Sequence, residues 1–595
     1  MIDAAMSVSA TGLLRRFHEV GVLGWADLHA AQQLCHLYDE RDESVALALA
    51  LTVRALRGGS VCLDLSAVRE LAFETEETLE QVPDELWPEP ASWHDKLTAS
   101  PAVTTGADAF GSRPLRLVGQ LLYLERYWRA EESVRVQLLR RQAGLVRDAP
   151  PEANARLDAL FSRDPGGWQR TAAALSLVSP LTVIAGGPGT GKTATIARLL
   201  SLLLSEEPGL RIALAAPTGK AAARMDQALQ EAIAGLPSEW ESTLTGLSAQ
   251  TLHRLLGWIP ESRSRFRHNA DNPLPHDVVV VDELSMVSLS LMARLMEAVR
   301  PSARLILVGD PDQLASVEAG AVLADIVAAN WPSLPGAAVS LGGLAIGRLS
   351  GPVVQLRHNH RFDGAIGDLA SFVRAGDADS AVGLLRSGSD QVSLSSVSEA
   401  GAALKDRVVT AARTVDWAAR AGEVGEALAA LDSHRLLCAH RRGPFGVAGW
   451  ARRVEKWLRD DVPGFGLEGE WYTGRPVMIS RNSAELGLYN GDTGLVMIRN
   501  GQPRVYFGDG RSVSPFLLEG AQTVFAMTVH KAQGSQFTSV SVVLPEADSP
   551  ILSRELLYTA ITRASERVTL IGTEEAVRRA IQRPARRASG LRERI

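Results

Sequence analysis

The chain has 595 residues, of which 46% are hydrophobic, 22% charged and 5% aromatic, and its formal net charge is −6. This length exceeds what one hydrophobic core organises and predicts several domains. The acidic balance excludes a globally basic surface, so a nucleic-acid site must be a local basic lining. Cys35, Cys62 and Cys438 lie far apart without a CxxC pair, which excludes a sequence-evident zinc or iron–sulfur site and favours buried thiols.

The first residues do not follow the pattern of a secretory signal peptide, because an acid and arginines flank a short apolar patch. The most aliphatic run nearby, 45–53, ends at Arg54 and is too short to span a bilayer. We therefore expect a soluble cytoplasmic protein. Residues 1–155 have a mostly helical pattern without a catalytic signature and are expected to form a helical N-terminal domain.

The remainder of the chain alternates apolar β-branched runs with helix-like segments. Such alternation predicts an α/β fold with parallel sheets covered on both faces. We expect one α/β domain over 156–355 and a second over 356–595. The predicted strands are 181–185, 211–216, 277–282 and 303–310 in the first, and 434–440, 524–530, 539–545 and 567–573 in the second.

Residues 465–520 have a different texture, with short alternating strands that predict a small inserted β-barrel. Asn-Gly and Asp-Gly pairs, which favour tight hairpin turns, join these strands at Asn490-Gly491, Asn500-Gly501 and Asp509-Gly510. The basic end of the chain, 578–595, is expected to be a solvated or disordered tail.

A complete P-loop pattern follows the first predicted strand and precedes a helical stretch. Its glycines let backbone N–H groups turn toward phosphate oxygens, and the helix N-terminus adds the positive end of its dipole. Lys192 is predicted to reach the β- and γ-phosphates of ATP, and the Thr193 hydroxyl to ligate Mg²⁺. The alternative is a glycine-rich turn without a ligand. The motif consists of Gly186, Gly187, Pro188, Gly189, Thr190, Gly191, Lys192 and Thr193.

Polar residues at other strand ends complete the expected ATP site. Asp282 is predicted to hold Mg²⁺ through water, and Glu283 to orient and deprotonate the attacking water, although an ordinary helix N-cap is the alternative. Gln313, in the loop of VGDPDQL, suits sensing of the γ-phosphate or its water. Gln169, upstream of the P-loop, is predicted to read the adenine edge with its amide.

Two arginines of the second α/β domain are candidate arginine fingers. Arg361 lies in LRHNHRF and Arg563 in LYTAITRA. An arginine supplied from a facing domain stabilises transition-state charge and couples hydrolysis to domain closure.

The order of these motifs resembles superfamily 1 helicases: the P-loop, VVVDELSM, VGDPDQL, LRHNHRF, TVHKAQGSQF and LYTAITRA. More closely, VGDPDQLASVEAGAVLADI, LLCAHRRGPFGVAGW, GRPVMISRNSAELGLYNGDTGLV and PLRLVGQLLYLERYW resemble the RecD family, the alpha subunits of bacterial RecBCD (exodeoxyribonuclease V). This resemblance implies two RecA-like motor domains, an SH3-like barrel, and ATP-dependent 5′–3′ helicase activity on double-strand DNA ends in recombinational repair. It also implies RecB-like and RecC-like partners, with residues 1–155 as the docking surface.

The same resemblance places single-stranded DNA contacts on strand-end loops of both motor domains. Hydroxyl, imidazole and ammonium groups there would bind backbone phosphates, which predicts little sequence preference. Local capping is the alternative for each threonine and histidine. The expected contacts are Pro217, Thr218 and Lys220; Thr251 and His253; and Thr528 and His530.

Three further expectations concern the limits of this chain's activity. Gln536 stands where many relatives carry glutamate, so it keeps an acceptor but loses the charge, and we assign it no ribose-binding role. No nuclease constellation is evident, so any DNA cutting by a complex is expected on another subunit. Two alternatives stay open: an assembly subunit whose ATP site is only structural or regulatory, and a freestanding helicase.

Overall fold

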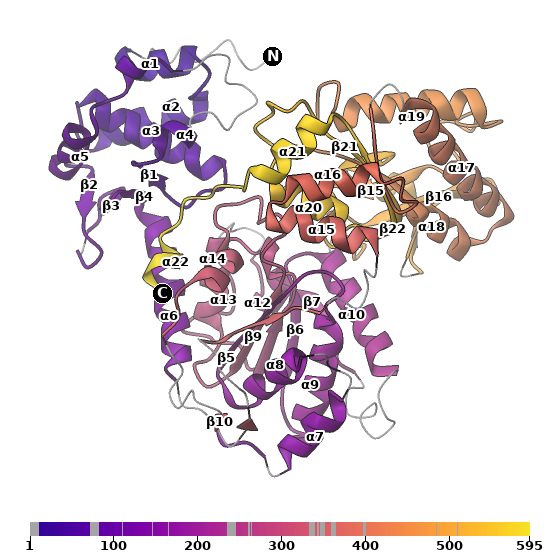
Figure 1. Cartoon of the computed structure of the whole chain (residues 1–595), viewed down its shortest axis with the longest axis horizontal. Coiled ribbons are helices and arrows are strands. Elements are labelled where there is room, and N and C mark those ends of the chain that lie inside the picture. Colours follow the sequence, from indigo (N-terminus) through magenta and orange to yellow (C-terminus); the bar gives the residue numbers. More distant parts are fainter. Residues whose placement is uncertain are drawn as a thin grey trace.

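A computed structural model describes the chain except for several short stretches. Figure 1 shows an N-terminal region, a first lobe below it and a second lobe beside it, with the C-terminus returning to the N-terminal region. In the part of the chain described, no helix is long and apolar enough to cross a membrane. The residues not described are 1–10, 72–81, 110, 145–146, 151, 163, 165, 235–245, 260–261, 263–264, 333–339, 342–343, 346–350, 359–363, 397–399, 484 and 509.

The N-terminal region is mainly helical, as expected, but it also contains a small sheet that the sequence did not predict. The helices are α1 (Gly12–Glu19), α2 (Trp25–Leu37), α3 (Glu43–Arg57), α4 (Val68–Leu71), α5 (Pro90–Ala99) and α6 (Glu125–Gln142). The sheet has the order β1-β4-β3-β2. Its strands are too short to show a two-residue period: β1 (Leu63–Asp64), β2 (Val103–Thr105), β3 (Leu115–Val118) and β4 (Leu121–Leu124).

The first lobe is built on a six-stranded parallel sheet with the order β12-β5-β9-β8-β6-β7. Alternate residues of β8 and β9 enter two separate hydrophobic cores, so the sheet is buried on both faces. The strands are β5 (Leu181–Gly186), β6 (Ile212–Ala216), β7 (Ala249–Thr251), β8 (Val278–Val281), β9 (Arg304–Gly309) and β12 (Val353–Leu356).

Different helices cover the two faces of this sheet. One core contains residues of α7 (Ala153–Leu160), α8 (Trp168–Val178), α9 (Lys192–Glu206) and α10 (Gly219–Ala234). The other contains residues of α12 (Leu252–Leu256), α13 (Leu289–Ala298), α14 (Val322–Ala328) and α6. Because α6 belongs to the N-terminal region, that region and the first lobe share a core.

The second lobe contains a five-stranded parallel sheet with the order β13-β22-β21-β14-β20. The strands are β13 (Val392–Ser395), β14 (His434–Cys438), β20 (Ala526–Thr528), β21 (Phe537–Val543) and β22 (Ala564–Ile571). One core contains residues of four helices: α15 (Ala365–Ala375), α16 (Ala378–Arg386), α20 (Arg554–Ile561) and α21 (Glu574–Gln582). Two separate cores contain residues of the other three: α17 (Ala400–Ala421), α18 (Val424–Ser433) and α19 (Val447–Asp461). The predicted strands of both parallel sheets are therefore confirmed.

Between β14 and β20 lies a five-stranded antiparallel sheet with the order β18-β17-β16-β15-β19. Asn500 (φ 52°) and Gly501 (φ 74°) form the tight turn between β16 and β17, as their sequence predicts. The strands are β15 (Pro476–Ile479), β16 (Thr493–Arg499), β17 (Gln502–Phe507), β18 (Ser512–Val513) and β19 (Ala521–Thr523).

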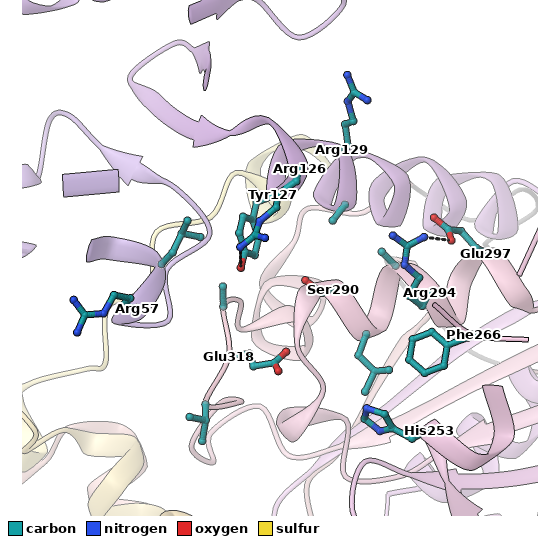
Figure 2. Close-up of a pocket in the computed structure, with 16 residues that line it drawn as sticks. Arg57, Arg126, Tyr127, Arg129, His253, Phe266, Ser290, Arg294, Glu297 and Glu318 are labelled. Atoms are coloured by element: carbon teal, nitrogen blue, oxygen red, sulfur yellow. Dashed lines mark hydrogen bonds and ion pairs between the residues drawn. The ribbon is translucent and has the colours of Figure 1, made fainter. Parts of the chain in front are cut away.

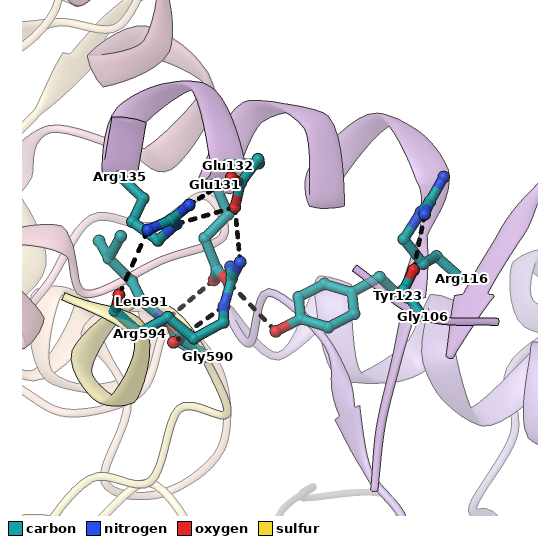
Figure 3. A network of polar contacts seen from close by, with 10 residues as sticks. Gly106, Arg116, Tyr123, Glu131, Glu132, Arg135, Gly590, Leu591 and Arg594 are labelled. Atoms are coloured by element: carbon teal, nitrogen blue, oxygen red, sulfur yellow. Dashed lines mark hydrogen bonds and ion pairs between the residues drawn. The ribbon is translucent and has the colours of Figure 1, made fainter. Parts of the chain in front are cut away.

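The expectation of a solvated C-terminal tail is wrong. Residues 583–595, called here the C-terminal strap, cross the first lobe and end in α22 (Leu591–Arg594) against α6. Leu591 is 1% exposed in the core that α6 shares with the first lobe. Arg594 binds Glu131 at 2.5 Å and Glu132 at 2.7 Å, and Figure 3 shows its side chain between these carboxylates. Arg594 of the strap thus has specific carboxylate partners.

Candidate active site

The P-loop connects β5 to α9 and has a backbone that requires glycine. Gly189 and Gly191 have φ values of 81° and 80°, which L-residues with side chains rarely adopt. A Cβ on Gly187 would lie 2.8 Å from the Tyr558 hydroxyl. The Lys192 ammonium donates to the carbonyl oxygens of Gly186 at 2.7 Å and Gly187 at 2.9 Å. Lys192 therefore lies against the loop, at the N-terminus of α9.

Two carboxylates follow β8 beside this loop. Asp282 is buried, and burial together with the neighbouring Glu283 raises its pKa, while Lys192 opposes the shift. Glu283 has a φ of 52°, an uncommon conformation for a residue with a side chain, and its N–H donates to Asp282 Oδ1 at 2.8 Å. Strained backbone of this kind is concentrated at functional sites, where the surrounding structure stabilises it.

The loop after β9 contacts the second lobe through a shared carboxylate. Gln313 Nε2 donates to Asp310 Oδ2 at 2.9 Å, and the Tyr558 hydroxyl donates to the same oxygen at 3.2 Å. Burial raises the pKa of Asp310 and also that of Tyr558. Tyr558 lies in the LYTAITRA motif, but no local pattern predicted its contact with the first lobe.

Two further hydrogen bonds fix this loop to the second lobe. The Leu314 N–H donates to Thr559 Oγ1 at 2.8 Å, and Gln533 Nε2 donates to the Leu314 carbonyl oxygen at 2.7 Å. The N–H and the carbonyl oxygen of Leu314 are thus bound by two different segments of the second lobe. Sequence reasoning did not identify Gln533 or Thr559, because no local pattern marks an interlobe contact.

A cavity of about 450 Å³ lies between the lobes and gathers most of the predicted catalytic residues. From the first lobe it is lined by Pro188, Gly189, Gly191, Lys192, Thr193, Asp282, Glu283 and Gln313. From the second lobe it is lined by Gln536 and Arg563. Residues that lie far apart in the chain therefore face one space.

Two arginines of this cavity are held by backbone carbonyl groups. Arg563 is buried and donates through Nε to Thr559 O at 3.1 Å and through Nη1 to Ser535 O at 3.3 Å. Arg224 of α10 donates to Gly534 O at 3.4 Å and was missed by the sequence analysis. Its only sequence signal is a cation four residues after Lys220 on the same helix. The other candidate finger, Arg361, lies outside the described residues.

Gln169 contacts the P-loop but does not line this cavity. Its Nε2 donates to the Thr190 carbonyl oxygen at 3.1 Å, and its Oε1 accepts from Arg198 Nη1 at 3.3 Å. Both ends of the amide are therefore used within the protein, and adenine recognition by Gln169 stays a prediction.

The three threonines of the predicted DNA contacts share one geometry. The hydroxyl oxygens of Thr218, Thr251 and Thr528 each accept a backbone N–H three residues later, at 3.2, 3.2 and 3.3 Å. These bonds are the local capping that the sequence left as an alternative. Because each hydroxyl acts as an acceptor here, its own proton remains able to donate to a phosphate oxygen.

The other predicted DNA contacts lie near these threonines. Pro217 is half-buried on the loop before α10, and Lys220 is half-buried in the first turn of α10, where Gly219 packs against Tyr489 of the antiparallel sheet. Burial lowers the pKa of Lys220 to about 8, and burial with two nearby arginines lowers that of His530 to about 4. His530 is therefore neutral at pH 7. His253 lies on a different cavity, with its ring 5.8 Å from that of Phe266.

The three cysteines behave as the sequence predicted. Cys35, Cys62 and Cys438 are buried free thiols, and burial raises the pKa of each. Neutral buried thiols act as small apolar side chains. They are therefore packing residues in three separate parts of the fold.

Three families match parts of the chain. The N-terminal domain of RecBCD enzyme subunit RecD matches residues 19–123, an AAA domain matches 169–319, and a UvrD-like helicase C-terminal domain matches 523–571. The last two matches contain the P-loop with Asp282, Glu283 and Gln313, and the motif with Arg563.

Relatives also align with the chain over its length. The RecBCD enzyme subunit RecD of Mycolicibacterium smegmatis is 49% identical and covers 98% of this chain and 99% of its own. That of Mycobacterium tuberculosis is 47% identical and covers 100% and 99%. The ATP-dependent RecD2 DNA helicase of Deinococcus radiodurans is 34% identical over 70% of this chain and 50% of its own. The chain therefore belongs to the RecD family of RecBCD enzyme subunits.

Proposed function

We propose that this chain is an ATP-driven DNA helicase subunit that hydrolyses ATP between its two lobes and moves along single-stranded DNA. One observation carries the proposal: a single cavity is lined by Lys192, Glu283 and Gln313 of the first lobe and by Arg563 of the second. The relatives are named as a RecD subunit or a RecD2 DNA helicase, which supports the same activity.

The residues of the cavity fit a nucleoside triphosphate with Mg²⁺. The P-loop offers backbone N–H groups and a lysine, and its glycines leave no room for side chains. Thr193 and Asp282 offer the oxygen ligands that Mg²⁺ prefers, and two adjacent carboxyl groups at a buried position favour a nearby cation. Bound there, Mg²⁺ would supply positive charge to the phosphate oxygens.

Each protein group then has a role in phosphoryl transfer to water. Glu283 takes the proton of the attacking water, and Gln313 holds that water or the γ-phosphate in position. Lys192 leaves the loop carbonyls and binds the β- and γ-phosphates. Arg563 stabilises the charge that develops on the transferred phosphoryl group, which links hydrolysis to the position of the second lobe.

Movement along DNA follows from alternating grip by the two lobes. Thr218 and Thr528 have matching capped geometry at strand ends of the two parallel sheets. Closure of the lobes around ATP changes the distance between these two DNA contacts, and release of the hydrolysis products restores it. Motion in the 5′–3′ direction accords with family membership. The step acts on backbone phosphates and carries little sequence preference.

The wider assignment includes partners and domains. The chain assembles with RecB-like and RecC-like subunits at double-strand DNA ends, and any nuclease centre belongs to another subunit. Docking of these partners at the N-terminal region is part of the same proposal. The domains are 1–155, 156–355 and 356–595, with an SH3-like barrel at 465–520.

Unwinding of 5′-tailed and 3′-tailed duplexes by the purified chain, alone and with its partners, tests the proposal. We expect ATP-dependent unwinding of the 5′-tailed substrate only, and none by Lys192→Ala, whose fold is checked by circular dichroism. ATP hydrolysis that does not rise on addition of oligonucleotide would contradict motor function. Size-exclusion of the same samples separates a complex-forming subunit from a freestanding helicase.

A further inference from the structure

A second cavity, of about 820 Å³, lies between the N-terminal region and the first lobe. Its volume is in the range of ~300–1,000 Å³ that ligand sites occupy. One wall is α6 with the end of α3, and the others are α13, His253 of α12, Phe266 and residues 317–319. The charged and aromatic lining residues are Arg57, Arg126, Tyr127, Arg129, His253, Phe266, Arg294, Glu297 and Glu318.

Four arginines of three helices are among the residues that line this space, together with two glutamates. Arg294 pairs with Glu297 at 2.7 Å, and its side chain is 48% exposed. Arg57 pairs with Asp27 and is 57% exposed. The exposed Arg294–Glu297 pair contributes only ~0–1 kcal/mol, so a phosphate can share or replace Glu297, whereas Arg57 holds the buried carboxylate of Asp27 and keeps that partner. Each guanidinium also has five N–H donors, of which these pairs use Nη1.

Arg126 is the least committed of these cations. It is exposed at the start of α6 and donates to the Tyr127 hydroxyl at 3.1 Å, with its guanidinium 4.7 Å from the Tyr127 ring centroid. Among the described residues it has no carboxylate partner. Figure 2 shows Arg126 and Tyr127 together on the α6 side of the cavity.

The opposite side of the cavity belongs to a predicted DNA contact. His253 and Phe266 lie there with ring centroids 5.8 Å apart, and Figure 2 shows them below Arg294. The backbone of Phe266 pairs with that of Trp258, whose side chain is 46% exposed. Aromatic rings beside guanidinium groups are the combination that binds the bases and backbone of single-stranded nucleic acid.

We infer that this cavity is a third contact for single-stranded DNA, in addition to those on the two lobes. The strand continues from Thr251 and His253, at the start of α12, into the space between the first lobe and the N-terminal region. Arg126 and Arg294 bind backbone phosphates, and Tyr127 and Phe266 stack on bases. The N-terminal region then holds the substrate in addition to any partner. This inference rests on the proposed function, since it extends the same DNA track.

Binding of the full chain to single-stranded oligonucleotides of graded length tests this contact. Strands that reach only the two lobes should bind Arg126→Ala as tightly as the wild-type chain. Longer strands should bind Arg126→Ala more weakly than they bind the wild-type chain. For these strands the slope of log K against log salt should be smaller for the variant by about 0.7, the value for one lost phosphate contact. Arg140→Ala is the matched control, because Arg140 is exposed on α6 away from the cavity.

Substitution of Tyr127 separates stacking from charge. Tyr127→Ala should lose roughly 5- to 150-fold in affinity for long strands, the range for one stacked base, whereas Tyr127→Phe should keep it. Equal binding by Arg126→Ala and Arg140→Ala at every length would overturn the inference, and so would equal loss for short and long strands. Lost partner assembly with unchanged DNA affinity would instead assign the cavity to an acidic protein segment.

The proposed function has a separate readout in the same samples. Oligonucleotide-stimulated ATP hydrolysis by the wild-type chain tests the motor itself. If oligonucleotide does not stimulate ATP hydrolysis, the proposed motor function is contradicted. If stimulation is normal but the Arg126 and Tyr127 variants bind DNA as tightly as the wild-type chain, only the third contact is contradicted.

Discussion

The Tyr558 hydroxyl of α20 donates to Asp310 Oδ2 at 3.2 Å, so the second lobe contacts a buried carboxylate of the first. The same hydroxyl abuts the P-loop, where a Cβ on Gly187 would approach it to 2.8 Å. Tyr558 therefore lies where nucleotide-dependent movement of the P-loop reaches the second lobe. Gln313, which shares Asp310 Oδ2, lines the cavity that we assign to ATP.

Tyr558→Phe should weaken the coupling of the lobes without opening a cavity. It leaves Asp310 with one side-chain donor fewer, which costs about 1–2 kcal/mol of stability at a buried acceptor. We expect normal ATP affinity with reduced oligonucleotide stimulation of hydrolysis. Tyr506→Phe, in the antiparallel sheet, is the control. Unchanged stimulation would show that the interlobe hydrogen bond does not transmit the signal.

Glu283→Gln should separate ATP binding from hydrolysis. The amide keeps the size of the side chain but cannot accept the proton of water, so hydrolysis should slow by at least ~10²-fold. Nucleotide affinity, measured by fluorescence with a labelled analogue, should stay near the wild-type value. Wild-type turnover would place the general base at another residue.

Asp325 should make stability depend on pH near neutrality. Burial raises its pKa to about 7, although a hydrogen bond with Ser589 opposes the shift. Since the folded chain then binds a proton that the unfolded chain has lost, stability should fall as pH rises through 7. Asp325→Asn stays neutral, so relative to wild type it should gain about 1–2 kcal/mol between pH 6 and pH 8 in urea unfolding. A constant difference would refute the raised pKa.

Arg594→Ala should destabilise the attachment of the C-terminal strap. Glu131 is buried, with 0% exposure, and loss of Arg594 leaves its carboxylate with the Tyr123 and Ser589 hydroxyls but without a cationic partner. Breaking such a pair costs on the order of 3 kcal/mol. Limited proteolysis should then cleave the strap earlier, whereas Arg592→Ala, an exposed neighbour, should behave as wild type. Equal cleavage of all three proteins would show that the ion pair does not hold the strap.

The parallel sheets and the P-loop could be predicted because their signals are local. Strands buried on both faces are continuous apolar runs, as in β8 and β9, and the P-loop is a contiguous motif. The N-terminal sheet could not be predicted, since its strands of two to four residues show no periodicity. Local capping by Thr218 was foreseen only as an alternative, because the same hydroxyl suits both roles.

Long-range polar contacts were the main omission. Tyr558 meets Asp310 across 248 positions, and Arg594 meets Glu131 across 463. A charged tail has the same composition whether it is solvated or bound, so composition indicated the wrong state for the strap. Only the positions of buried carboxylates in the folded chain distinguish these cases.

The strap also determines the order in which the molecule can be completed. Chains fold from the N-terminus during synthesis, but Leu591 belongs to the core formed by Val61, Tyr123, Trp128 and the first lobe. These residues leave the ribosome hundreds of positions before Leu591 does. The core between the N-terminal region and the first lobe is therefore completed only after the strap has been synthesised and has left the ribosome, when Leu591 can reach α6.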